Sequence, residues 1–234
     1  MDKNNNQVWS DKSNRILEHA STLKQYNRWL VSLFRPYLKG RVLEVGAGLG
    51  GLSKMLPKKN LTLSDYNPTY LEHLKKDIGV DTLHLNIEKN APGQYLGFFD
   101  AILSSNVFEH IKNDDLALAN CFKLLSDGGY LLLFVPAGPE ILGSLDRDMG
   151  HFRRYTLSEV KSKVCKAGYK IVEIRYANFL GYFAWWGRGL FLRQSPADGV
   201  LAKIFDFFVA PFLYLEKYVN PPFGQSIFLV AQKI

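Results

Sequence analysis

Hydrophobic and polar positions follow two alternating periods along this chain of 234 residues. Short apolar runs bounded by glycine, proline or charged residues are typical of strands, and stretches with apolar residues every three or four positions are typical of helices. Their alternation predicts an α/β domain with a parallel sheet. Seven strands are expected, at 41–45, 61–64, 82–85, 100–103, 130–135, 170–176 and 226–232.

The helical stretches divide the chain further. An amphipathic helix is expected over 14–38, a short one over 49–55, one beginning near Pro68 and one over 114–125. Thr156 and Glu159 have the spacing of a capping box, and Gly168 suits the end of that helix. We therefore expect a single domain, with a disordered tail (1–12), an N-terminal helix (13–40), a core (41–176), an aromatic-rich insert (177–225) and a final strand (226–234).

The segment VLEVGAGLGG (42–51) is the most informative motif. An apolar strand leads into Gly46, Gly48 and Gly50, and Glu44 lies two positions before the first glycine. Glycines at such a turn allow a cofactor to lie against the backbone and accept positive φ angles. Asp65 lies 19 positions after Gly46, at the end of the next strand. A carboxylate at this place accepts hydrogen bonds from the two hydroxyls of a ribose.

Two cofactors fit these letters. Gly46, Gly48 and Gly51 also satisfy the G-x-G-x-x-G pattern of dinucleotide-binding proteins such as NAD-dependent oxidoreductases. S-adenosylmethionine is favoured because Glu44 would meet its cationic amino group, whereas a pyrophosphate would be repelled by that acid. The chain also lacks a second half for a nicotinamide-dependent substrate site. A non-catalytic cofactor-binding protein stays open as a further alternative.

Residues 41–135 carry a series of motifs in a fixed order: VLEVGAGLG, LSDYNP (63–68), LHLNIEK (83–89), FDAILSSNVFEHI (99–111) and LLSDGGYLLLFVP (124–136). This series resembles the class I S-adenosylmethionine-dependent methyltransferases, in particular their type 11/12-like members that act on small molecules or glycolipids. The resemblance implies a seven-stranded Rossmann-like sheet with helices on both faces and a helical aromatic lid between strands six and seven. It also implies S-adenosylmethionine as cofactor and S-adenosylhomocysteine as product.

The resemblance assigns the cofactor-binding residues. The methionine end would be held by Glu44, Gly46, Ala47 and Gly48, and the ribose by Asp65. Tyr66 and Ile87 would flank the adenine, and Asn86 would bond its edge, although many relatives have Asp at that position. The sulfonium side would be lined by Ser104, Ser105 and Asn106.

Further along, DRDMGHFRRYT (146–156) looks like a subgroup associated with polysaccharide and glycolipid synthesis. This favours methyl transfer to oxygen on a small, glycan- or lipid-linked or hydrophobic acceptor, with nitrogen or carbon as alternatives. A hydroxyl acceptor must lose its proton. Two histidines, His110 and His151, are expected at the carboxyl ends of the strands and are the candidate bases. The alternative is a packing role for both.

The residues around His151 suggest two further hypotheses. Arg153, Arg154 and Tyr155 either bind the acceptor or stabilise the loop. Asp146 and Asp148 suggest a metal, but two carboxylates without a third ligand are a weak case, so we expect none. The tetrapeptide NPPF (220–223) also occurs in enzymes that methylate amino nitrogens, where it ends the fourth strand. Here it precedes the final strand, and we expect a turn.

The aromatic insert and the net positive charge of the chain suggest which partners the protein contacts. The insert holds Trp185 and Trp186, which either pack within a lid or contact an apolar acceptor or a membrane. An excess of 29 Lys and Arg over 22 Asp and Glu gives a net charge of +7, which suits an anionic surface. We expect weak peripheral contact with an anionic membrane and no nucleic acid. Cys121 and Cys165 are expected to be core thiols, which indicates a cytoplasmic location.

Overall fold

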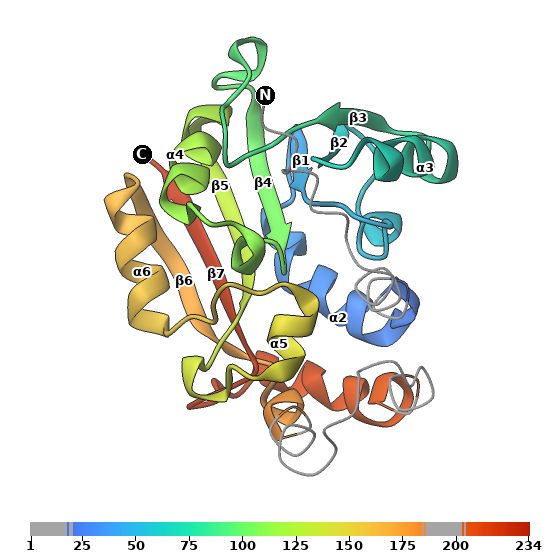
Figure 1. Ribbon diagram of the computed structural model, residues 1–234, viewed down its shortest axis with the longest axis vertical. Coiled ribbons are helices and arrows are strands. Elements are labelled where there is room, and N and C mark those ends of the chain that lie inside the picture. The colour runs from blue at the N-terminus through green and yellow to red at the C-terminus, as the bar shows by residue number, and fades with distance from the viewer. Residues whose placement is uncertain (1–17, 19–20, 184, 186–202, 204) are drawn as a thin grey trace.

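The computed structural model describes residues 18, 21–183, 185, 203 and 205–234, apart from the side chains of 145, 205 and 217 (Figure 1). The predicted tail (1–12) and Trp186 lie outside this part. Within it, seven strands form one sheet in the order β3-β2-β1-β4-β5-β7-β6. Their bounds are β1 Val42–Val45, β2 Leu61–Asp65, β3 Asp81–His84, β4 Phe99–Ser105, β5 Leu125–Pro136, β6 Tyr169–Ala177 and β7 Ser226–Lys233. The α/β fold and the seven-stranded sheet predicted from the sequence are confirmed.

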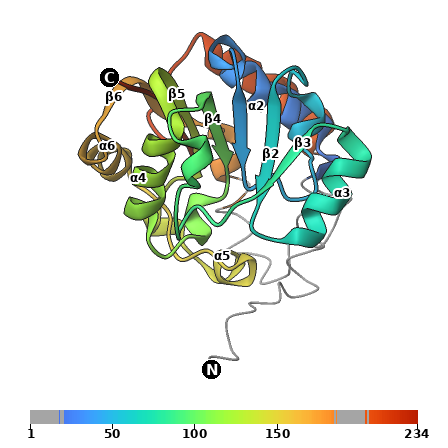
Figure 2. The same cartoon turned by 90° about the horizontal axis from the view of Figure 1, so that it is seen from above.

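The helices cover both faces of the sheet, as Figure 2 shows from above. On one face α4 (Asp114–Leu124) and α6 (Leu157–Lys166) bury Leu118 and Val160 against the sheet. On the other, α2 (Lys24–Phe34) and α3 (Pro68–Ile78) bury Trp29 and Leu74. Every residue of β1 is buried, because a central parallel strand is covered on both sides.

The strand directions show which edge of the sheet carries the carboxyl ends of the parallel strands. β1 to β5 run parallel, and only β7 is antiparallel to its neighbours β5 and β6. The register pairs Val45 with Ser64 and with Ser104, so β1, β2 and β4 end at the same edge. The short helix α5 (Ser144–Met149) and the described part of the insert lie beyond this edge, at the lower side of Figure 1. Loops from separate parts of the chain therefore meet there.

Two predicted helices are shorter than expected. The helix over 14–38 is interrupted at Leu23 (φ −76°, ψ 79°), so α2 begins at Lys24 and ends in a 3-10 turn, η1 (Arg35–Tyr37). The helix over 49–55 is only a 3-10 turn, η2 (Ser53–Met55), because Gly48 and Gly50 have positive φ angles that break a helical ladder.

Two acidic side chains fix the described part of the insert, Asp206 against the core and Glu216 within the insert itself. Asp206 accepts hydrogen bonds from the backbone N–H groups of Gln25 and Tyr26, at 3.1 and 2.8 Å, and so caps the first turn of α2. Glu216 accepts from the N–H groups of Asn178 and Phe179, at 2.9 and 2.8 Å. The described part of the insert contains the π-helical turn η6 (Phe205–Val209) and the 3-10 helix η7 (Ala210–Lys217). The predicted helical character is present here.

Smaller expectations have mixed outcomes. Thr156 caps α6 by accepting from the N–H of Glu159 at 3.1 Å, as predicted. NPPF forms the turn before β7 rather than the end of β4. β5 begins directly after α4 and includes the expected turn at Gly128, which has φ +77°. Cys121 is buried, but the prediction of a core position for Cys165 is wrong, because this residue is on the exposed face of α6.

Candidate active site

The glycine turn after β1 leaves room for a ligand. Gly46 and Gly48 both have positive φ, 77° and 53°. A Cβ on Gly46 would collide with Val107, whereas one on Gly48 would meet no atom of the described residues within 4 Å. The N–H groups of Gly46 and Ala47 both donate to the Ser64 carbonyl at 2.9 Å. Hydrogen bonds to β2 thus fix the turn, and the space beside the Cα atom of Gly48 is free of described protein atoms.

Glu44 is buried at the base of this turn. Burial raises the pKa of its carboxyl from 4.5 to about 7. Its Oε2 has no hydrogen-bond partner among the described residues. A buried carboxylate oxygen without a partner is costly. The cationic amino group of S-adenosylmethionine would supply that partner, so this acid fits the methionine end of the cofactor.

Asp65 ends β2 beside the turn. Its Oδ2 accepts a hydrogen bond from the N–H of Gly48 at 2.9 Å, and its Oδ1 accepts from the N–H of Asn67 at 2.9 Å. Burial raises the pKa of this carboxyl, although these backbone donors act in the opposite direction. Each oxygen has a second lone pair. The geometry therefore fixes the carboxylate beside the glycine turn with lone pairs left to accept further hydrogen bonds, and its assignment to the ribose stays a prediction.

The other predicted cofactor residues occupy the same edge in different ways. Tyr66 is exposed, whereas Ile87 is buried. The side chain of Asn86 accepts from the N–H of Glu88 at 3.1 Å. Ser104 is buried and its hydroxyl donates to the Val45 carbonyl at 3.2 Å, so this hydroxyl stabilises the sheet. Asn106 adopts φ +53° and its amide contacts the Ser105 hydroxyl at 3.3 Å.

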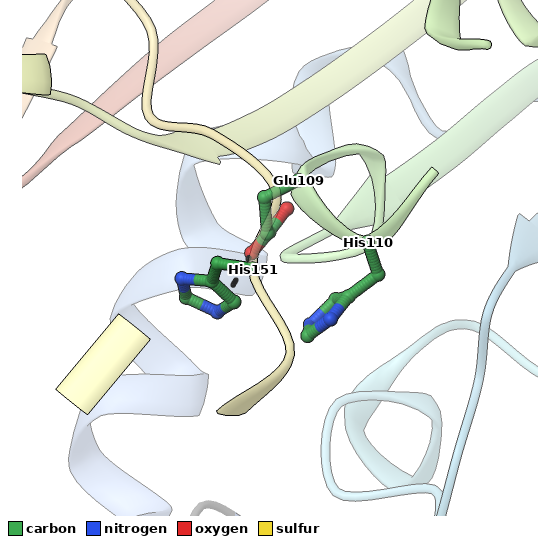
Figure 3. A group of neighbouring side chains, drawn as sticks. All are labelled: Glu109, His110 and His151. Carbon is green, nitrogen blue, oxygen red and sulfur yellow. Dashed lines mark ion pairs between the residues drawn. The ribbon is translucent and has the colours of Figure 1, made fainter. Parts of the chain in front are cut away.

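A second polar cluster lies where β4 ends. Glu109 and His110 belong to the 3-10 turn η4 (Phe108–His110), and His151 follows α5 (Figure 3). The two histidine rings meet edge to face with centroids 4.8 Å apart. Nε2 of His151 lies 3.8 Å from Oε1 of Glu109. The structure therefore brings together the two predicted candidate bases, which are 41 positions apart in the sequence.

Asp146 orients His151. Its Oδ1 contacts Nδ1 of His151 at 2.8 Å and also accepts from Nε of Arg154 at 2.8 Å. Its Oδ2 accepts from the N–H of Gly143 at 3.0 Å. These donors, the His151 ring and Arg154 above all, hold the pKa of the Asp146 carboxyl below its usual value against the opposing effect of burial. Asp146 is therefore a fixed, ionised partner for the imidazole.

Arg154 links the cluster to the insert. It is buried, donates to the Ala137 carbonyl at 2.9 Å, and its guanidinium stacks 4.7 Å from the centroid of the Trp185 ring. Burial lowers the pKa of this guanidinium from 12.5. Of the predicted acceptor-binding residues, Arg154 shares Asp146 with His151, and Trp185 contacts Arg154.

Two other predicted acceptor residues lie elsewhere. Tyr155 is buried in the core, and its hydroxyl donates to Asp114 at 2.9 Å and to the Phe108 carbonyl at 3.2 Å. Arg153 pairs with Asp114 at 2.9 Å and donates to the Lys112 carbonyl at 2.8 Å. Both stabilise the loop, because the buried side of this segment is occupied by α4. These contacts favour the loop-stabilising alternative for both residues, and their assignment to the acceptor stays a prediction.

Glu109 is the residue that the sequence analysis missed. Its side chain is 0% exposed, and neither carboxylate oxygen has a hydrogen-bond partner among the described residues. Burial raises the pKa of this carboxyl to about 7, and burial lowers the pKa of the adjacent His110 to about 3. The signal was present in the sequence as an acid directly before His110, at the end of a buried strand.

The described part of the insert exposes several apolar side chains, a set that we call the insert face. It comprises the exposed side chains of η6, η7 and the residues directly after them: Phe207, Phe208, Phe212, Leu215, Tyr218 and Val219. Phe207 is 71% exposed and Phe208 62%, although both belong to a turn whose neighbours Ala210 and Leu213 are fully buried. Among the described helices, none is long and apolar enough to cross a membrane.

Comparison with known proteins supports the motif analysis. Residues 43–131 match the family described as a methyltransferase domain. The polyketide synthase PksR of Bacillus subtilis is 32% identical over 145 residues, which are 55% of this chain and 6% of the synthase. Ribosomal RNA small subunit methyltransferase C of Erwinia tasmaniensis is 37% identical over 84 residues, 34% of this chain and 25% of the enzyme. The chain thus spans a small part of these curated relatives.

The fold is shared over a much longer stretch. The crystal structure of an S-adenosylmethionine-dependent methyltransferase from Thermotoga maritima, described as a possible histamine N-methyltransferase, superposes with a TM-score of 0.64 at 18% identity. The superposition covers 94% of this chain and 95% of that protein. Strand order, the open glycine turn with Glu44 and Asp65, and the family match agree. Together these findings support a class I S-adenosylmethionine-dependent methyltransferase: residues 43–131 match a methyltransferase domain, and the chain shares the fold of solved methyltransferases.

Proposed function

We propose that this protein transfers the methyl group of S-adenosylmethionine to a hydroxyl oxygen of a lipid-linked acceptor at the surface of an anionic membrane. In the reaction a C–O bond forms, the C–S bond to the sulfonium breaks, and the hydroxyl proton leaves. The sulfonium is a good leaving group that needs no acid. A hydroxyl acceptor does need a group that stabilises the loss of its proton.

The contact between His151 and Asp146 carries the oxygen part of the proposal. Because Asp146 engages Nδ1 at 2.8 Å, the lone pair of His151 is on Nε2. Asp146 and His151 come after β5, and His151 lies beside Glu109, which comes after β4. The carboxyl end of β4 is next to that of β1, which leads into the cofactor turn. His110 has a different environment, with Nδ1 on the Gly150 carbonyl at 3.3 Å. The geometry favours His151 over His110 as the group that meets the acceptor proton.

The insert face supports the lipid part of the proposal. Exposed aromatic and aliphatic side chains gather there, on a segment that Asp206 joins to α2. A hollow between α2 and η7 is lined by Arg28, Arg35 and Tyr214, so cationic groups lie beside apolar ones. Such a combination binds anionic headgroups and inserts apolar side chains below them. Each exposed cation near the surface contributes about 1 kcal/mol.

Label transfer tests the reaction. The full chain is incubated with S-adenosylmethionine labelled in the methyl group and with a total membrane lipid extract, or with the water-soluble metabolites of the same cells. We expect label in the organic phase, in a product stable to mild alkali as a methyl ether is. Label confined to the water-soluble fraction would refute the lipid acceptor, and an alkali-labile or amine-bound label would refute the ether.

Vesicle binding tests the surface. The protein is co-sedimented with phosphatidylglycerol-containing vesicles at low and high salt. We expect binding at low salt that weakens at high salt, because screening reduces the attraction of the cations. Phe207→Ser with Phe208→Ser should weaken it. Val172→Ser is the matched control, since Val172 is 47% exposed on β6, outside the insert face. Equal binding by all three proteins would contradict the proposal.

A further inference from the structure

Glu109 has an unusual environment for a carboxylate. It is fully buried, and both of its oxygens lack a hydrogen-bond partner among the described residues. Nε2 of His151 at 3.8 Å is too distant for a hydrogen bond. Leaving an acceptor buried and unpaired costs roughly 1–3 kcal/mol, and more for a charged group. A cation bound between Glu109 and the histidines would remove this cost.

Each of the two histidine rings is held by a contact at its Nδ1 atom. Nδ1 of His151 is engaged by Asp146 at 2.8 Å, and Nδ1 of His110 by the Gly150 carbonyl at 3.3 Å. With Nδ1 donating in both rings, Nε2 carries the lone pair. Metal-binding histidines usually donate their other ring N–H to a carboxylate or a carbonyl, which fixes the tautomer and the ring orientation. Asp146 is itself held by Arg154 and the N–H of Gly143.

We propose that Glu109, His110 and His151 bind one divalent transition-metal ion of the zinc type, with a coordination position left for the acceptor oxygen. One ligand atom from each residue lies within 4.8 Å of the others (Figure 3). In a tetrahedral site with bonds of about 2.1 Å, ligand atoms are about 3.4 Å apart. Side-chain movements of about 1 Å would bring all three ligand atoms to this separation. Oε1 of Glu109 and Nε2 of His151, 3.8 Å apart, are already close to it.

The donor set selects the ion. Two imidazoles and one carboxylate suit zinc and its neighbours, whereas magnesium and calcium prefer oxygen ligands alone. Three protein ligands with one open position are typical of catalytic zinc sites. The site differs from the pair Asp146 and Asp148 considered in the sequence. Asp146 acts here as an outer partner of His151 and not as a ligand.

This inference rests on the proposed function and adds how the hydroxyl is activated. A hydroxyl bound to a divalent ion loses its proton more readily, as metal-bound water does. The proton passes to solvent, the alkoxide oxygen forms the C–O bond, and the sulfonium keeps the electron pair of the broken C–S bond. No oxidation or reduction is involved. His151 then serves as a ligand instead of taking the proton itself.

Metal binding can be measured without an acceptor. Untagged, metal-stripped protein is titrated with Zn²⁺ by calorimetry and with Co²⁺ by visible absorption. We expect one ion per chain and a Co²⁺ spectrum with the intensity of a low-coordinate nitrogen and oxygen site. His110→Ala with His151→Ala should abolish binding, and Glu109→Gln should weaken it at least 10-fold. His73→Ala is the matched control, because His73 pairs with Asp77 at 3.4 Å on the surface. It should bind Zn²⁺ as the wild type does.

A second measurement uses only the wild type. In protein with ¹⁵N-labelled histidine, Zn²⁺ should shift the signals of two of the five rings. Absence of stoichiometric binding, loss of binding in His73→Ala, or full methyl transfer by chelator-treated protein would overturn the metal site. The last result would leave the proposed function intact. Zn²⁺ binding at Glu109, His110 and His151 without methyl transfer to any hydroxyl would support the metal site and refute the proposed function.

Discussion

The cofactor turn and the acceptor cluster each contain a buried glutamate that lacks a hydrogen-bond partner on at least one oxygen among the described residues. Glu44 lies in β1, and Glu109 lies directly after β4. Burial raises the pKa of both carboxyls to about 7. The surroundings differ, however. Glu44 adjoins a turn whose geometry is open at Gly48, whereas Glu109 faces two histidine rings.

The two surroundings suggest two different partners for a buried carboxylate. At Glu44 we expect the missing partner to be the amino group of the bound cofactor, because Oε2 has no hydrogen-bond partner among the described residues. At Glu109 the proposed partner is a metal ion, which the neighbouring His110 and His151 would also bind. Buried carboxylates with strongly shifted pKa values concentrate at functional sites. The two regions should therefore respond independently to substitution.

The largest expected effect is on the acceptor side alone. His151→Ala should reduce methyl transfer to the membrane lipid extract by roughly 10²–10⁴-fold, because either a base or a metal ligand is removed. The affinity for S-adenosylhomocysteine should be unchanged by calorimetry. A parallel loss of cofactor affinity would show that the two regions are one coupled unit, and near-full turnover would show that His151 has no role in activating the acceptor.

The next effect is on the cofactor side. Asp65→Ala should weaken S-adenosylhomocysteine binding by roughly 1.5–3 kcal/mol, the range for hydrogen bonds to a charged group. The loss includes the bond to the N–H of Gly48, which fixes the turn. Thermal unfolding of the free variant serves as the control for folding. Wild-type affinity in a folded variant would refute the assignment of Asp65 to the ribose.

Glu44→Gln should have opposite effects on stability and binding. The carboxyl has a pKa of about 7 in the folded chain against 4.5 unfolded, so the folded chain binds the proton more tightly. The contribution of Glu44 to the free energy of unfolding is therefore greatest below pH 4.5 and is lost as the pH rises through 7. Above pH 7 the variant should be more stable than the wild type by about 1–3 kcal/mol, and near pH 5 the difference should be small.

The same substitution should weaken S-adenosylhomocysteine binding above pH 7, because the ionised carboxylate that meets the amino group is absent. Chemical unfolding and calorimetry at pH 5 and pH 8 provide both readouts. If Glu44→Gln destabilises the free protein at pH 8, the Glu44 carboxylate has a stabilising partner in the free protein. Glu44 and Glu109 would then not both be unpaired buried carboxylates.

The sequence predicted the cofactor because the signals for it are local. Glu44, the glycines and Asp65 come from two consecutive strands, and the parallel register places them at one edge. The acceptor side depends on contacts between distant residues, such as Asp146 with Arg154 and His110 with His151. His110 and His151 were predicted separately, but Glu109 was missed because its burial is visible only in the fold.

Long-range packing also determines features that the sequence alone could not show. Tyr155 follows two arginines in a polar motif, which suggested a ligand-binding role, yet it fills the core and bonds Asp114. The start of α2 depends on Asp206, about 180 positions away, and no local pattern contains that information. The exposed aromatic side chains of the insert face were visible as composition, but their exposure depends on which of them the core accommodates.

The smallest expected effect comes from a carboxylate that already has its partners. Asp100 bonds Nε and Nη2 of Arg41, both at 3.1 Å, and Arg41 is the main reason that the pKa of this carboxyl is lowered to about 2. Because the folded pKa is depressed, the contribution of Asp100 to the free energy of unfolding is present above pH 4 and is lost as the pH falls toward 2. Both side chains are more than a third exposed, so solvent screening limits that contribution to about 0.5–1 kcal/mol.

Asp100→Asn should lower the free energy of unfolding by this amount at pH 7, with a smaller loss in high salt. It should change neither S-adenosylhomocysteine binding nor Zn²⁺ binding. A stabilising effect above pH 7, as expected for Glu44→Gln, would mean that pairing does not distinguish a structural carboxylate from the two unpaired ones.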